Sequence, residues 1–152
     1  MNTITLAEIG EIQIKKGNHK LTNVNIFFIY SFLYPLTGMA DDDEQVKYYM
    51  ENKPGSEDDY RLIIRQILVP SFKDLNETEQ DKAKVALKYL LNKNNVDFDR
   101  IFETKLPPFE LVIEPRNFFL WIWEELFGPE EYIIENLEGY KENKNMHEPN
   151  RY

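Results

Sequence analysis

Residues 115–127 read PRNFFLWIWEELF, and this stretch decides the fold. Eight of its thirteen residues are large and apolar, and at 3.6 residues per turn they cover nearly every side of a helix. Pro115 suits the first helical turn because that turn needs no N–H donor, and Gly128 suits the end. A helix that is apolar nearly all round is normally buried. The sequence therefore predicts a central helix over 115–127 on which other elements pack.

Helical signals recur on both sides of this stretch. The clearest follows Ser56, a good N-cap, with apolar residues from Tyr60 at helical spacing and a stop expected at Pro70. Asn76 followed by Glu79 predicts the start of another helix, which the Asn94-Asn95 pair would end. The remaining predicted helices are 41–52 with Asp41 as N-cap, 97–103 and 130–138.

Strand signals are fewer. Partial alternation predicts one or two short strands in 3–16, and alternation after two prolines predicts an edge strand over 109–114. Residues 21–36 stay open between strand and helix, with helix favoured. The predicted fold class is α+β, mainly α, with about five to six helices packed on the aromatic helix and a small β element from the N-terminus and 109–114. Residues 1–140 would form one domain, and 141–152 a polar C-terminal tail.

Composition excludes several classes of site. The 152 residues contain no cysteine, which removes disulfides, thiolate metal sites and cysteine nucleophiles. The longest apolar run, 26–36, has 11 residues, far short of the roughly 20 that a membrane-spanning helix needs. We therefore expect a cytoplasmic protein that does not contact a membrane.

Catalytic and cofactor motifs are also missing. The six glycines are never closer than seven residues apart, so no glycine-rich phosphate loop exists. The two histidines, His19 and His147, lack the spacing that would put two metal ligands on one helix face. We expect no catalytic residues, no metal and no cofactor, and favour a protein that is not an enzyme.

Acidic charge is concentrated in two segments. Residues 41–60 carry eight Asp and Glu against two Lys, and residues 106–140 carry eight Glu against one Arg, within a net charge of −9. Capping and the helix dipole explain why acids stand at helix starts. They do not explain why so few Lys and Arg balance them. The pattern predicts an acidic surface that meets a positively charged partner.

The leading hypothesis is a small acidic inhibitor that binds a basic protein and occludes it. The partner would be a nuclease-type toxin or another nucleic-acid-handling enzyme, with no direct binding of nucleic acid by the chain itself. In its small size, acidity and lack of cysteine and of a catalytic set, the chain resembles bacterial immunity proteins and antitoxins as a class. The predicted partner-binding residues are Asp41, Asp42, Asp43, Glu44, Tyr48, Tyr49, Glu57, Asp58, Asp59, Tyr60, Glu130, Glu131 and Tyr132.

Two alternatives stay open. A carboxylate-type hydrolase would use Glu124 or Glu125 as general acid beside Trp121 and Trp123, with a second carboxylate from 110–114. A helical scaffold or regulatory subunit would instead expose an apolar patch, for example from 24–36, to another chain. The oligomeric state is left open.

Overall fold

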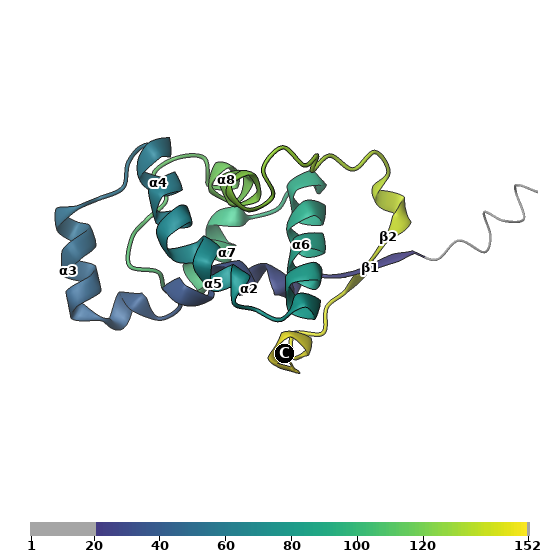
Figure 1. The fold of residues 1–152 in the computed structure, drawn as a ribbon, viewed down its shortest axis with the longest axis horizontal. Coiled ribbons are helices and arrows are strands. Elements are labelled where there is room, and N and C mark those ends of the chain that lie inside the picture. The colour runs from purple at the N-terminus through teal and green to yellow at the C-terminus, as the bar shows by residue number, and fades with distance from the viewer. Residues whose placement is uncertain (1–20, 152) are drawn as a thin grey trace, which may run out of the picture.

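The aromatic helix α8, Pro115–Phe127, has the predicted bounds in the computed structural model, which describes residues 21–151 (Figure 1). It packs against α4, η4, α5, α6 and α7. Five of its side chains are in the core: Phe118, Phe119, Trp121, Ile122 and Trp123. The central position of this helix is thus confirmed, because five helical elements that precede it in the chain pack on it.

The described chain is mostly helical, which confirms the predicted fold class. Short 3₁₀ segments connect several of the helices. The helical elements besides α8 are η1 (Ile26–Ile29), α2 (Tyr30–Leu33), η2 (Tyr34–Leu36), η3 (Met39–Asp41), α3 (Asp43–Glu51), α4 (Glu57–Ile63), η4 (Ile64–Leu68), α5 (Val69–Lys73), α6 (Glu77–Asn92), α7 (Phe98–Thr104), η5 (Leu137–Gly139) and η6 (Glu148–Arg151). No helix in this described part is both long and apolar enough to cross a membrane.

Local capping sets where the helices begin. Ser56 and Asp59 form a capping box at α4, and the side chain of Asn76 accepts a hydrogen bond from Glu79 N–H at α6, so both predicted starts are confirmed. The prediction for α3 was wrong by one residue. Asp42 is the N-cap, while Asp41 still belongs to the preceding 3₁₀ turn.

The expected stop at Pro70 was wrong. The chain continues as a helix to Lys73, through the π-helical segment η4 and into α5, where Pro70 occupies the first turn. A proline inside an α-helix lacks one hydrogen-bond donor and its ring crowds the carbonyl four residues earlier. The wider π turn before Pro70 accommodates this disturbance without ending the helix.

A small parallel sheet joins distant parts of the chain. Strand β1, Thr22–Asn25, pairs with β2, Tyr140–Asn143, with Thr22 opposite Tyr140. Residues 21–36 therefore contain both predicted alternatives, a strand first and helical turns from Ile26 onward. The strands predicted within 3–16 lie outside the described residues.

Two predicted elements are absent from the described chain. Residues 109–114 form no strand; here the Tyr60 hydroxyl lies 2.8 Å from the carbonyl oxygen of Glu110 and accepts the N–H of Val112. Residues 130–138 form no α-helix, because the Asn92 side chain bonds the carbonyl of Tyr132 and the N–H of Ile134 and holds the segment extended. In both segments, a side chain that is distant in sequence forms hydrogen bonds with backbone groups.

Strand β2 is fastened to α6 through one carboxylate. Glu142 accepts hydrogen bonds from the Tyr89 hydroxyl and the Lys93 ammonium, each at 2.6 Å. The bonds from Lys93 and Tyr89 lower the pKa of Glu142, while burial and this carboxylate raise the pKa of Tyr89 to about 12. Further along the chain, Glu148 forms an ion pair with Lys82 at 3.0 Å.

The predicted division of the chain into a domain over 1–140 and a tail over 141–152 stays a prediction.

Substituting Tyr60→Phe should lower the free energy of unfolding by about 1–3 kcal/mol, because it leaves the buried Pro54 carbonyl and the part-buried backbone groups of Glu110 and Val112 without their partner. Urea unfolding would measure this. The matched variant Tyr34→Phe changes a ring that is 69% exposed and should leave the unfolding midpoint unchanged. Equal midpoints for the two variants would contradict the role of the Tyr60 hydroxyl.

The hydrogen bonds that Glu142 accepts from Tyr89 and Lys93 should make the free energy of unfolding decrease at acid pH. The pKa of Glu142 is lower in the folded protein than its usual value of 4.5, so its contribution is complete above that pH and is lost as pH falls through the folded pKa. Glu142→Gln should therefore flatten the acid side of a melting-temperature profile. The exposed control Glu138→Gln should keep the wild-type slope. A profile for Glu142→Gln that runs parallel to wild type would count against this contribution of Glu142.

Candidate functional site

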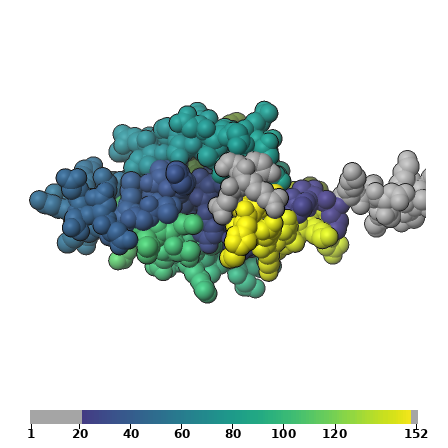
Figure 2. Space-filling model, turned by 90° about the horizontal axis from the view of Figure 1, so that it is seen from below, coloured from purple at the N-terminus to yellow at the C-terminus, as the bar shows by residue number. Residues whose placement is uncertain are grey.

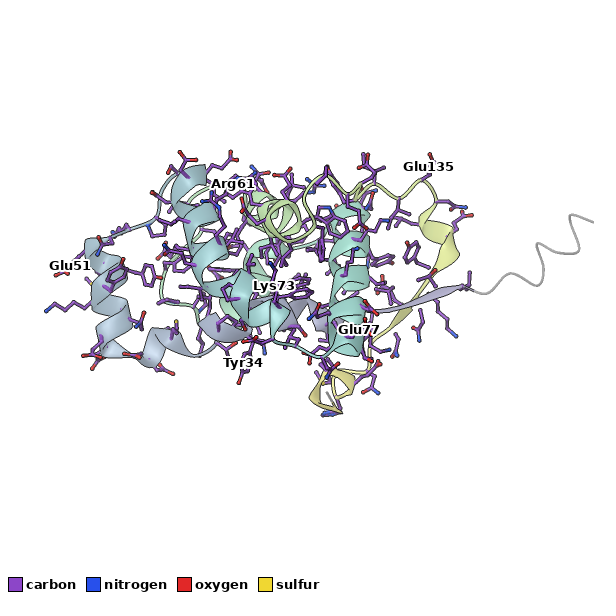
Figure 3. The ribbon with its side chains drawn as sticks, in the orientation of Figure 1. Tyr34, Glu51, Arg61, Lys73, Glu77 and Glu135 are labelled. Atoms are coloured by element: carbon purple, nitrogen blue, oxygen red, sulfur yellow. The ribbon has the colours of Figure 1, made fainter. Side chains whose placement is uncertain are left out.

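The acids of helix α3 and those of residues 130–138 lie in different parts of the molecule, whereas Glu57 and Glu124 meet at Arg61. Helix α3 stands at one end of the long axis, with Glu51 at the left in Figure 3, whereas Glu135 lies at the upper right. The structure thus does not bring 41–60 and 130–138 together into one face. We treat them separately below.

The first group is named the α3 surface and consists of the exposed side chains on η3 and α3. Its acids are exposed, and Asp42 also caps the helix by accepting from the N–H groups of Glu44 and Gln45. Large apolar atoms accompany them, since Tyr48 is 54% and Met50 68% exposed. The members are Asp41, Asp42, Asp43, Glu44, Lys47, Tyr48, Met50 and Glu51.

The acids of the α3 surface are not neutralised by the described chain. None of them forms an ion pair with a Lys or Arg of residues 21–151. Lys47 is the basic residue within the helix, against Asp43, Glu44 and Glu51. An acidic field therefore surrounds the exposed ring of Tyr48.

A single aromatic contact anchors α3 to the body. Tyr49 is buried, with its ring centroid 5.1 Å from that of Phe109 and 4.9 Å from that of Tyr48. Tyr49 was predicted to contact a partner, but burial makes it a support for Tyr48 instead. The side chain that remains available on this face is Tyr48.

The acids at the start of α4 serve the helix itself. Glu57 pairs with Arg61 at 2.7 Å. Asp59 closes the capping box, and hydrogen bonds from Gly55 N–H and from Ser56 lower the pKa of its carboxyl. Asp58 is exposed and forms no ion pair within residues 21–151. Tyr60, also predicted as a surface anchor, is fully buried among Phe109, Phe118 and Trp121.

The carboxylates at the end of α8 are bound by two arginines of the α4–η4 helix. Arg61 donates to both Glu124 and Glu125, and Arg65 donates to Glu125 at 2.9 Å. The Arg61 guanidinium also lies 5.7 Å from the ring centroid of Trp121. Burial would lower the pKa of Arg61, but the hydrogen bonds that it donates to Glu124, Glu125 and Glu57 raise that pKa above its usual value. We call this set the guanidinium network.

This network does not favour the hydrolase alternative. A general acid must hold a proton and face a substrate, whereas Glu124 and Glu125 both face guanidinium donors. Trp121 and Trp123 are buried, with Trp123 donating its indole N–H to the carbonyl of Glu130. The tryptophans thus act as packing groups rather than as walls of an open site.

The remaining predicted contacts lie beyond the end of α8. Glu130 pairs with Lys84 at 2.8 Å, and the Glu131 side chain accepts the N–H of Ile133. Tyr132 is half-buried, with the Arg116 guanidinium 5.9 Å from its ring centroid. These residues stabilise the extended segment that leads toward β2.

Sequence reasoning missed the basic residues that neutralise the second acidic segment. Glu57 and Arg61 stand four residues apart, which is a helix-pair signal that could have been read. The partnerships of Arg61 and Arg65 with α8, and of Lys84 with Glu130, span 46 to 64 residues. No local pattern reveals such pairs.

Comparisons with protein-family models, with curated proteins and with solved structures found no match. Among residues 21–151, no three His, Asp or Glu side chains are grouped so that they could hold a metal ion. The chemistry of this chain therefore has to be read from its own surface, where the acids of the α3 surface form no ion pair with the described residues.

Replacing Arg61 should destabilise the fold, since three carboxylates lose a shared donor that is only 18% exposed. We expect Arg61→Met to lower the free energy of unfolding by about 1–3 kcal/mol. Arg61→Lys should recover only part of this because a single ammonium cannot replace the forked guanidinium. Denaturant unfolding measures both variants.

Arg65→Met is the matched control, because Arg65 is 52% exposed and contacts one carboxylate. Its effect should stay below about 1 kcal/mol. An Arg61→Met protein as stable as Arg65→Met would show that the network does not hold α4 to α8.

Proposed function

We propose that this protein is a small acidic inhibitor that binds a basic protein through the α3 surface. The partner would be a nuclease-type toxin or another enzyme that handles nucleic acid, as for immunity proteins and antitoxins. Binding would occlude a positively charged site by presenting carboxylates where phosphates would otherwise lie. We infer a cytoplasmic setting, which is consistent with the lack of cysteine.

One observation carries this proposal: the acids on η3 and α3 form no ion pair within residues 21–151 and accompany the exposed side chain of Tyr48. Glu124, Glu125 and Glu130 form ion pairs with basic side chains from α4, η4 and α6. The acids on η3 and α3 form none within residues 21–151. Uncompensated charge on one end of a molecule raises the encounter rate with an oppositely charged surface and orients it.

The apolar atoms on α3 would supply the second part of the interaction. Tyr48 is more than half exposed, and Glu44 and Glu51 share its face of the helix, four residues before it and three after it; Met50 is exposed on another face. Tyrosine and methionine are enriched at protein interfaces, where desolvated anchors provide much of the affinity while charges steer the approach. The proposed contact set is smaller than the one expected from sequence, since Tyr49 and Tyr60 are buried.

The test is capture of the partner from the native cell by the full chain and by Asp41→Asn/Asp42→Asn/Asp43→Asn. Asparagine at position 42 retains a good N-cap, so α3 should stay folded. The wild-type chain should retain a basic protein at low salt and release it at high salt, because the Debye length falls from about 30 Å at 0.01 M to about 3 Å at 1 M. The triple variant should fail to retain the basic protein at either salt concentration.

Glu131→Gln/Glu135→Gln/Glu138→Gln is the matched control, because it removes the same charge from exposed residues of the other segment. It should capture the partner as wild type does. Equal loss in both triple variants would mean that net charge alone matters. Capture that is indifferent to salt and to both variants would favour the scaffold alternative.

A further inference from the structure

A groove lies on the side of the molecule opposite to the core face of residues 26–36. Its volume is about 920 Å³, within the range of roughly 300–1,000 Å³ that small-molecule sites occupy. Three aromatic side chains of this helical run, Phe27, Tyr30 and Tyr34, line one wall. Figure 2 looks onto this side, where the purple and blue run lies beside the yellow C-terminal segment.

The aromatic wall is a platform rather than part of the core. The run 26–36 turns Phe28, Phe32 and Leu36 inward, where each is at most 1% exposed. Its other face carries the rings of Phe27 and Tyr30, whose planes are inclined by 30°. Tyr34 is 69% exposed and points away from the body at its lower edge (Figure 3). Exposed ring faces of this kind stack with planar ligands.

A cation stands above the platform. The ammonium of Lys105 lies 4.5 Å from the ring centroid of Tyr30 and forms no ion pair with any acid of residues 21–151. Its backbone is fixed, since the carbonyls of Lys105 and Leu106 accept hydrogen bonds from Gly38 and Ala40 N–H at 2.8 Å. Leu106 has a φ of +52°, which is strained for a residue with a side chain. The tie holds the ammonium at the groove.

On the opposite wall, the carboxylate of Glu79 faces the groove and does not form the usual capping hydrogen bond. Glu79 is the third residue of α6, where a glutamate normally bonds back to the N–H of the N-cap. Here only Asn76 provides a cap bond, and the Glu79 carboxylate accepts the hydroxyl of Ser31 at 2.8 Å instead. Both side chains line the groove. The second carboxylate oxygen provides an acceptor for a ligand N–H.

These three features select one ligand chemistry. We propose that the groove binds a small planar heteroaromatic anion of the purine nucleoside monophosphate class. Its ring stacks on the exposed Tyr34, its N–H edge donates to Glu79, and its phosphate pairs with Lys105, which lies over Tyr30. A polynucleotide fits less well, because a net charge of −9 repels a long polyanion whereas one phosphate needs one cation. This site is separate from the α3 surface.

Calorimetric titration of the full chain with GMP tests the site. GMP should bind one to one, and guanosine and inorganic phosphate should each bind more weakly because each offers half of the contacts. Lys105→Met, which retains the stem that covers Tyr30, should weaken GMP by about 10-fold and leave guanosine unchanged, the effect of losing one charge-assisted contact. Glu79→Gln and Tyr34→Ala should weaken both GMP and guanosine.

Lys141→Met is the control, because it removes one exposed charge from β2 outside the groove and should bind GMP as wild type does. Circular dichroism and melting temperature verify that each variant is folded. No binding of GMP by the folded wild-type chain would overturn the proposal. So would equal loss in Lys105→Met and Lys141→Met, or binding of a single-stranded oligonucleotide without binding of GMP.

Discussion

An α-helix that is apolar on nearly every side has to be covered on every side, and the rest of this structure follows from that constraint. Helix α8 buries two tryptophans and two phenylalanines, a large apolar area for thirteen residues. The α4–α5 run and α6 and α7 supply the cover. The one polar group of Trp123 also needs a partner, and its bond to the Glu130 carbonyl fixes how the chain leaves the helix.

The acidic side chains around this buried helix are of two kinds, those paired with basic side chains and those without such a partner in the described chain. Where acids meet the body, arginine and lysine from α4, η4 and α6 neutralise them and hold α8 in place. Where acids lie on the projecting α3, the described chain leaves them uncompensated beside exposed Tyr48. The same residue type therefore acts as a structural counter-ion at one end of the molecule and as a candidate recognition group at the other.

The groove beside residues 26–36 depends on the same packing in a different way. One face of that helical run is used by the core, which leaves its aromatic second face without cover from the helices behind it. Backbone bonds between the 38–40 turn and residues 105–106 then bring Lys105 over Tyr30. The groove is thus formed by segments about 70 residues apart that the core has already brought together.

The sequence alone determined α8, α4 and the start of α6, because helical periodicity and caps such as Ser56 with Asp59 are local signals. It also located the acidic charge. Only tertiary structure decided which acids are neutralised, that 130–136 forms no helix, that the helix passes Pro70, and that Tyr49 and Tyr60 are buried. Each of these depends on partners far along the chain, such as Asn92 for Ile134 or Arg61 for Glu124, which no local pattern contains.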